Sequence, residues 1–303
     1  MNASDVIGYV EAGDGVSALA PSLAALSSVA IDGVNITASG TGISTAGAGE
    51  RAILAKAHSS GERGELLLGN FTEALGDFDT SAAHKLFASD ANRRAVIAAL
   101  VAGVAAQGWD GVQLDFESLD AADMNGLTRF TTELRSALPA ARTLSMAVMA
   151  SATTQEYRDS AYDLPALARQ LTHVVLMAYD QHGPTWSGPG PVGGLPWVKT
   201  TLTALLASVP AAKVVLGVAG YGYTWPTRET GTQLSDAAAR AVAKKGVATW
   251  DATQGEWHAT LAAGGELWWS DAKSLQVRRN VARSLGIDGV AVWSLGLSDP
   301  VTE

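Results

Sequence analysis

Short, almost wholly apolar runs recur along the chain and alternate with longer segments whose apolar residues fall at helical spacing. Runs of four to eight apolar residues bounded by turn residues are typical of strands buried on both faces. The longer segments place apolar residues three and four positions apart, as in an amphipathic helix. We expect eight strands, at residues 5–10, 28–36, 65–70, 108–118, 144–149, 174–180, 213–223 and 288–293.

Helices are expected after most of these strands. The helix that starts at Ser89-Asp90 is the clearest, because Gly108 follows its last turn in the position of a left-handed cap. The other predicted helices span residues 18–26, 51–58, 120–139, 163–171, 195–206 and 271–285.

Strand–helix alternation of this kind predicts an α/β fold with a parallel sheet, and eight units favour a closed (β/α)8 barrel. We expect one domain over residues 1–303, with a doubly wound open sheet as the alternative. The chain stops soon after the eighth strand, so the eighth helix is expected to be missing or replaced.

The alternation breaks between about residues 224 and 271. Short alternating runs at 247–250 and 266–269 are separated by turn residues. This pattern predicts a small antiparallel insertion between the seventh and eighth strands.

The fourth strand has one apolar face and one acidic face. Its even-numbered positions from 112 to 116 are apolar, whereas Gln113, Asp115 and Glu117 point to the opposite side. If that side faces the barrel interior, two carboxylates share a confined space and cannot both ionise cheaply. One of them then keeps a proton near neutral pH, as a general acid must.

Composition excludes several classes of function. Hydrophobic residues make up 47% of the 303 residues and charged residues 17%, which favours a large buried core over disorder. The net charge of −9 argues against a surface that neutralises nucleic-acid phosphates. The absence of cysteine excludes disulfides and thiolate chemistry.

Neither a metal nor an organic cofactor is expected. The histidines show no spacing typical of a metal site, and no Walker or GxSxG motif is present. The five histidines are His58, His84, His173, His182 and His258. No apolar run is long enough to span a bilayer, and residues 1–5 lack a charged and apolar leader.

Polar and aromatic residues close several predicted strands, where the active site of a barrel lies. They are Glu117, Tyr179, Asp180, Tyr221 and Trp293. Each alone is explained by packing or by loop capping. Together, carboxylates, phenols and an indole at one mouth suit a sugar, because aromatic rings stack on sugar faces and polar groups bind its hydroxyls.

The residues at these strand ends resemble glycoside hydrolase family 18, the chitinase-like barrels. Residues 110–117, DGVQLDFE, are similar to the family signature DGxDxDxE, and residues 177–180 are similar to its MxYD segment. Trp293 matches the family's tryptophan on strand eight, and residues 217–222 partly match its seventh strand. Residues 179–184 and 195–198 are closer in character to bacterial spore-cortex and cell-wall N-acetylglucosaminidases.

The resemblance implies a retaining hydrolase of β-linked N-acetylglucosamine polymers, of chitin or peptidoglycan type. In such substrate-assisted enzymes, the sugar's own acetamido oxygen attacks the anomeric carbon. Glu117 would protonate the glycosidic oxygen, Asp115 would hold the acetamido N–H, and Tyr179 would donate a hydrogen bond to the acetamido group. Trp293 would form the floor of the sugar site, and Asp180 would bind hydroxyls or assist Tyr179.

Other residues receive weaker expectations, from the resemblance or from their positions at strand ends and in loops. Gln113 replaces the middle aspartate of the signature, so it would orient Asp115 without a charge of its own and alter the pH profile. Asp110 would support the two acids, while Tyr221 and His182 would bind substrate.

A secreted or cell-envelope location is expected, with any export signal absent from this sequence; a cytoplasmic protein would look the same here. The main alternative function is a non-catalytic lectin or inhibitor on the same barrel. Such proteins typically lack the catalytic glutamate, and Glu117 is present. A barrel hydrolase that uses two carboxylates without the acetamido group is a more distant alternative.

Overall fold

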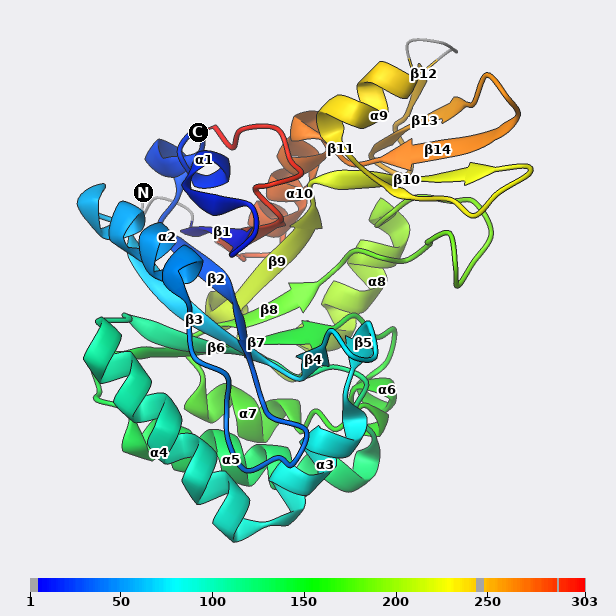
Figure 1. The fold of residues 1–303 in the computed structure, drawn as a ribbon. Helices are drawn as coiled ribbons and strands as arrows, with labels where there is room; N and C mark the ends of the chain where they lie inside the picture. Colours follow the sequence, from blue (N-terminus) through cyan, green and yellow to red (C-terminus); the bar gives the residue numbers. More distant parts are fainter. Residues whose placement is uncertain (1–4, 244–247, 288, 303) are drawn as a thin grey trace.

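The computed structural model describes residues 5–243, 248–287 and 289–302, and its centre is a closed barrel of parallel strands (Figure 1). The barrel closes where β1 pairs with β15, with Ile7 opposite Ala291. Closure confirms the predicted barrel and excludes the open sheet. In chain order the strands are β1 (Asp5–Glu11), β2 (Ser28–Asn35), β3 (Arg63–Gly69), β6 (Gly111–Asp115), β7 (Thr143–Met149), β8 (Val174–Met177), β9 (Val214–Ala219) and β15 (Gly289–Trp293).

Helices surround the barrel, and most coincide with the predicted ones. The predicted ends of α4 are confirmed: Ser89 Oγ accepts a hydrogen bond from the backbone N–H of Asn92, and Gly108 has a φ of 81°. The helices around the barrel are α1 (Gly15–Leu19), α2 (Ala48–Ser59), α3 (Thr80–Ala88), α4 (Asp90–Gln107), α5 (Met124–Ala137), α6 (Thr154–Asp159), α7 (Leu164–Gln170), α8 (Leu195–Leu206) and α10 (Ala272–Ser284).

The sequence prediction missed α3 and α6. Both are short, and their helical character depends on capping more than on periodicity. Asp79 caps α3 through the N–H of Ala82, and α6 starts with a capping box in which Thr153 and Glu156 bond each other's backbone.

Strand alternation produces two apolar layers. One set of side chains points outward and packs against the helices. A smaller set fills the barrel interior, as expected for a closed eight-stranded barrel. The interior set is Ile7, Tyr9, Ala30, Leu67, Val175, Val215 and Ala291, with Trp293 packed against it.

The predicted antiparallel insertion follows β9, at the carboxyl end of the barrel (Figure 1). It starts at Tyr221, slightly earlier than predicted, and the expected strand residues Val247 and Asp288 lie outside the described part of the chain. The insertion comprises β10 (Tyr221–Pro226), β11 (Gln233–Ser235), α9 (Asp236–Ala243), β12 (Ala248–Asp251), β13 (Glu256–Thr260) and β14 (Gly265–Trp269).

A buried ion pair connects the insertion to the barrel. Arg278 of α10 donates to Oε1 of Glu256 of β13 at 2.7 Å, and both side chains are almost fully buried. The Glu256 carboxylate also accepts hydrogen bonds from the backbone N–H groups of Val192 and Gly193, at 2.8 and 2.9 Å. One carboxylate therefore joins the insertion, α10 and the loop between β8 and α8.

Residues 294–302 continue from β15 without forming a helix, as expected for the eighth unit. The backbone N–H of Val301 donates to Ser22 Oγ at 3.0 Å, so this segment returns to the first unit. Among the described helices, none is both long and apolar enough to cross a membrane.

Candidate active site

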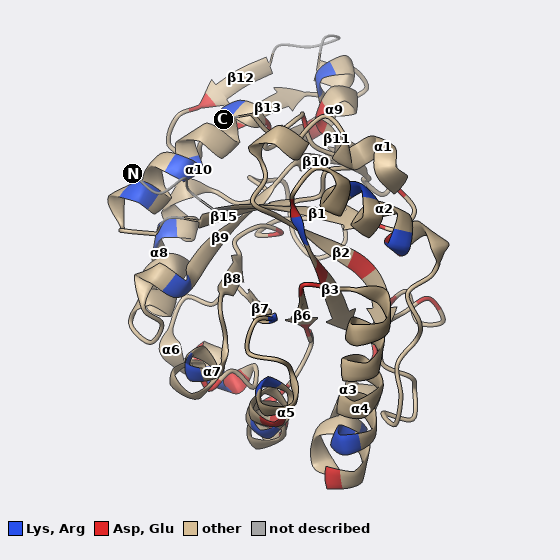
Figure 2. Cartoon of the chain, turned by 90° about the vertical axis from the view of Figure 1, so that its left-hand side faces the viewer, with Lys and Arg blue, Asp and Glu red and all other residues tan. Residues whose placement is uncertain are grey.

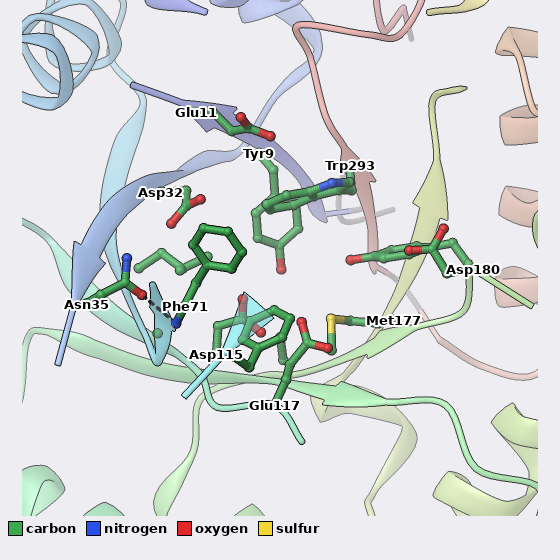
Figure 3. A pocket seen from close by; sticks show the side chains of 15 residues that line it. Tyr9, Glu11, Asp32, Asn35, Phe71, Asp115, Glu117, Met177, Asp180 and Trp293 are labelled. Carbon is green, nitrogen blue, oxygen red and sulfur yellow. Dashed lines mark hydrogen bonds between the residues drawn. The ribbon is translucent and has the colours of Figure 1, made fainter. Parts of the chain in front are cut away.

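A cavity of about 330 Å³ opens at the carboxyl ends of the barrel strands (Figure 3). Its lining combines carboxylates with aromatic rings, and both come from many different strands. The lining residues are Tyr9, Glu11, Asp32, Asn35, Leu67, Gly69, Phe71, Phe78, Asp115, Glu117, Ala147, Met177, Tyr179, Asp180 and Trp293.

Asp115 and Glu117 lie together in this cavity. Asp115 is the last residue of β6, and Glu117 follows two positions later on the same side of the chain. Burial is the main cause that raises the pKa of both carboxyl groups, and the charge of Asp115 raises the pKa of Glu117 further. Asp115 is only 9% exposed, and its Oδ1 has no hydrogen-bond partner among the described residues. This oxygen is therefore available to a donor on a ligand.

The backbone of Glu117 is held by Asn70, which directly follows β3. Asn70 Nδ2 donates to the carbonyl oxygen of Glu117 at 3.1 Å, and Asn70 Oδ1 accepts from the Glu117 N–H at 3.0 Å. Ser118, the next residue, has a φ of 57°, a left-handed conformation that needs such support. Asn70 thus fixes the direction in which Glu117 leaves the strand.

Asp180 also lines the cavity, and two phenols hold its carboxylate. Its Oδ1 accepts hydrogen bonds from Tyr221 at 2.6 Å and from Tyr223 at 2.9 Å. Tyr179 lines the cavity beside it. Trp293 also reaches the cavity, where its ring lies 5.2 Å from that of Tyr9.

A sequence model of glycosyl hydrolases family 18 matches residues 70–298, about three quarters of the chain. The chain belongs to this family.

Known relatives agree with the family assignment. The chain is 23% identical over 246 residues to "Uncharacterized glycosylase YvbX" of Bacillus subtilis, which covers 76% of this chain and 70% of the relative. It is 29% identical over 222 residues to "Cortical fragment-lytic enzyme" of Bacillus subtilis, covering 69% of this chain. The chain spans about half the length of that relative, 51%.

The fold of this family 18 chain is similar to that of a chitinase from Chromobacterium violaceum. The two structures superpose with a TM-score of 0.88 at 26% sequence identity. The similarity covers 98% of this chain and 96% of the chitinase chain.

The structure corrects the supporting role predicted for Asp110. Asp110 precedes β6, at the end of the barrel opposite the cavity. Its carboxylate accepts from the Gly64 N–H at 2.9 Å and pairs with His58 at 2.8 Å and Arg142 at 3.1 Å. Although Asp110 and Asp115 belong to the same motif, Asp110 directly precedes β6 and Asp115 is its last residue.

Gln113 also differs from the prediction. Its side chain is fully buried in the barrel, where Oε1 accepts from the Tyr9 hydroxyl at 2.5 Å and Nε2 donates to Glu65 Oε2 at 3.5 Å. Ser145 donates to the other oxygen of Glu65 at 3.3 Å. The amide of Gln113 therefore orients Tyr9 rather than Asp115.

Two predicted substrate-binding residues do not line the cavity. Tyr221 is fully buried, and its hydroxyl is used to position Asp180. His182 lies in the loop after β8, where its Nδ1 is 2.9 Å from the carbonyl oxygen of Pro191. The position of Tyr221 at a strand end indicated that it lies near the cavity. Only the tertiary structure shows that its hydroxyl bonds Asp180 and does not line the cavity.

The sequence prediction missed the contribution of the first three strands. Tyr9 and Glu11 of β1, Asp32 of β2, and Asn35 and Phe71 nearby all line the cavity. Inward alternation along β1 was the available signal, because Tyr9 and Glu11 point to the same side as interior Ile7. Among the described residues, no group of three or more His, Asp or Glu side chains is arranged to hold a metal ion.

Proposed function

We propose that this chain is a retaining glycoside hydrolase that cleaves β-linked N-acetylglucosamine polymers of chitin or peptidoglycan type by substrate-assisted catalysis. The observation that carries the proposal is the pairing of Glu117 with Asp115, whose buried Oδ1 has no partner in the described part of the chain. The names of the relatives, a cortical fragment-lytic enzyme and a chitinase, support this substrate class. Both polymers lie outside the cytoplasm, so the proposed place of action is the cell envelope or its surroundings.

Each step of the proposed reaction uses one group of the cavity. Glu117, protonated, gives its proton to the glycosidic oxygen as the bond to the anomeric carbon breaks. The substrate's acetamido oxygen forms the new bond to that carbon, while Asp115 accepts a hydrogen bond from the acetamido N–H and stabilises the positive intermediate. Glu117 then takes a proton from the water that opens this intermediate, which restores the starting configuration.

The cavity wall positions the sugar in this scheme. Tyr179 donates a hydrogen bond to the acetamido group, and Trp293 offers its ring as a platform for the sugar face. Asp180 binds sugar hydroxyls with the carboxylate that Tyr221 and Tyr223 hold in place.

The test is to incubate the protein with an N-acetylglucosamine tetramer and with purified peptidoglycan, and to identify the products. We expect products with free reducing N-acetylglucosamine ends that first appear as the β-anomer. A thiazoline mimic of the intermediate should inhibit competitively. Cleavage that the thiazoline does not inhibit would favour two-carboxylate catalysis, and no cleavage of either polymer would favour a binding protein.

The proposal also predicts the pH dependence. The pKa of Asp115 is raised to about 7 and that of Glu117 to about 9, chiefly by burial. The active form needs Asp115 ionised and Glu117 protonated, so kcat/KM should rise as the pH increases through about 7 and fall through about 9. Because the two groups interact, these limbs belong to the pair. A profile with its maximum near about pH 4, as ordinary carboxyl groups would give, would contradict the assignment.

A further inference from the structure

The cavity is more acidic than the proposed reaction requires. Five carboxylates line it, and no Lys, Arg or His appears among the lining residues that the structure describes. Lys and Arg lie instead on outer helices such as α4, α5, α8 and α10 (Figure 2). Asp115, Glu117 and Asp180 have roles in the proposed reaction, whereas Glu11 and Asp32 have none.

Glu11 and Asp32 occupy neighbouring positions on the barrel wall. They are paired in register across β1 and β2, and adjacent strands lie about 4.8 Å apart. Figure 3 shows both on one side of the cavity, opposite Asp180. Among the described residues, neither Glu11 nor Asp32 forms an ion pair.

A bulge fixes the position of Asp32. The register between β2 and β3 shifts between Ile31 and Val34, so the chain bends at Asp32 and Gly33. Gly33 has a φ of 147°, and a Cβ there would lie 2.4 Å from Glu50 Oε1. Bulges beside active sites commonly redirect a side chain, and this one accompanies an acid that lines the cavity.

The unpartnered oxygen of Asp115 lies in the same part of the cavity. After burial, Asp32 is the group that raises the pKa of Asp115, so the two carboxylates are within electrostatic reach of each other. A buried acceptor without a protein partner can accept a hydrogen bond from a ligand or from water. The cavity therefore presents carboxylates in sequence, from Asp115 to Asp32 and on to the exposed Glu11 at the mouth.

We propose that Glu11 and Asp32 form a subsite for the free ammonium group of a glucosamine unit, next to the N-acetylglucosamine unit held at Asp115. This inference rests on the proposed function and specifies its substrate as a partly de-N-acetylated glycan. An ammonium supplies a positive charge, which neither carboxylate has from an ion pair with a described residue, and it adds hydrogen-bond donors to the backbone donor that Asp32 has in Gly33. A neutral acetamido group supplies no charge, and a sugar bearing a carboxylate would be repelled. A metal ion is a poorer occupant, because no third ligand completes a set among the described residues.

The test compares kcat/KM for a fully acetylated hexamer of N-acetylglucosamine with that for a partly de-N-acetylated hexamer, below the pKa of the sugar ammonium. One close charge pair near a protein surface justifies a preference of roughly tenfold for the partly de-N-acetylated hexamer. The Glu11→Gln/Asp32→Asn double variant should bring this ratio close to one. The ratio of the two kcat/KM values is the readout, because a change in the pKa of Asp115 would affect the cleavage of both substrates alike.

A matched control removes a carboxylate outside the cavity. Glu73 is exposed in the turn between β4 (Phe71–Thr72) and β5 (Asp77–Phe78), and it does not line the cavity. Glu73→Gln should leave the ratio at its wild-type value. The ratio should also fall at high salt if charge attraction is its origin. A ratio that is the same in the wild type and the double variant would overturn the subsite.

A binding measurement separates this inference from the proposed function. A fully de-N-acetylated glucosamine tetramer has no acetamido group, so it cannot be cleaved with substrate assistance, and its binding is measured by calorimetry. We expect the double variant to weaken this binding about tenfold. Loss of binding in the double variant would support the subsite even if neither hexamer is cleaved, whereas unchanged binding would refute it even in an active hydrolase.

Discussion

Replacing Glu117 with Gln is expected to abolish hydrolysis of N-acetylglucosamine oligomers while leaving the fold intact. Gln keeps the shape of the side chain but has no proton to give to the leaving oxygen and cannot accept one from water. A positioned general acid contributes roughly 10²- to 10⁴-fold to a rate, so kcat should fall by about that factor. The measurement is product release from a tetramer, with inhibitor binding as a check that the cavity remains formed.

Glu73→Gln is the control for this variant, because it makes the same chemical change on the exposed β4–β5 turn. It should keep wild-type turnover. At neutral pH, thermal unfolding of Glu117→Gln should occur at or slightly above the wild-type temperature, because the folded protein keeps Glu117 protonated at a pH where the unfolded chain ionises it, as the raised pKa indicates. Near-normal turnover by Glu117→Gln would refute its assignment as the acid.

Replacing Arg278 with Met is expected to reduce the free energy of unfolding by about 3–5 kcal/mol, the usual cost of leaving a buried charge unpaired. Arg278 is 1% exposed and bonds Glu256 and the carbonyl oxygens of Gly193, Gly255 and Ser274. Without it, the donors to Glu256 among the described residues are the backbone N–H groups of Val192 and Gly193. Burial already raises the pKa of Glu256, and Arg278 is the largest of the influences that lower it. Urea unfolding measures the loss.

Arg283→Met is the matched control, on the exposed side of the same helix. A surface change of this kind should stay within about 0.5 kcal/mol of the wild type. Adding Glu256→Gln to Arg278→Met removes the unpaired charge and should recover part of the stability. If Arg278→Met unfolds at the same urea concentration as Arg283→Met, the pair does not stabilise the junction of the insertion and the barrel.

The same ion pair also bears on the active site. Glu256 holds the N–H groups of Val192 and Gly193, and the carbonyl of Val192 accepts from the N–H of Gln181, next to Asp180. The loop that carries Asp180 is thus fixed from the insertion side. The position of Asp180, in the loop after β8, therefore depends on contacts made far along the chain.

The local sequence was sufficient for the strands, most helices and the central acids. Apolar runs, caps and strand alternation act over a few residues, so they are legible without tertiary information. Alternation alone placed Asp115 and Glu117 on the same side of the fourth strand, and the structure shows that this side faces the cavity. The family 18 model matches residues 70–298, and this range contains the strand-end motifs on which the resemblance to family 18 was based.

The roles of individual side chains depended on barrel closure. Asp110 and Asp115 stand five positions apart in one motif, yet one lies at each end of the barrel, because a strand extends about 3.3 Å per residue. Tyr221 was predicted to bind substrate, but its hydroxyl donates a hydrogen bond to Asp180 and so positions that carboxylate.

The sequence by itself determined eight strands of a parallel α/β fold, an acidic fourth strand and an antiparallel insertion, because these features are encoded in local periodicity. It favoured a closed barrel over an open sheet, and the pairing of β1 with β15 decided between them. Only the tertiary structure decided which side chains meet. The Tyr9 hydroxyl is hydrogen-bonded to Gln113, which lies 104 positions later in the sequence. Glu11 lies beside Asp32 because the two residues are paired in register on β1 and β2. Such pairings arise from closing the sheet, which fixes strand order and stagger together, and no short segment contains that information.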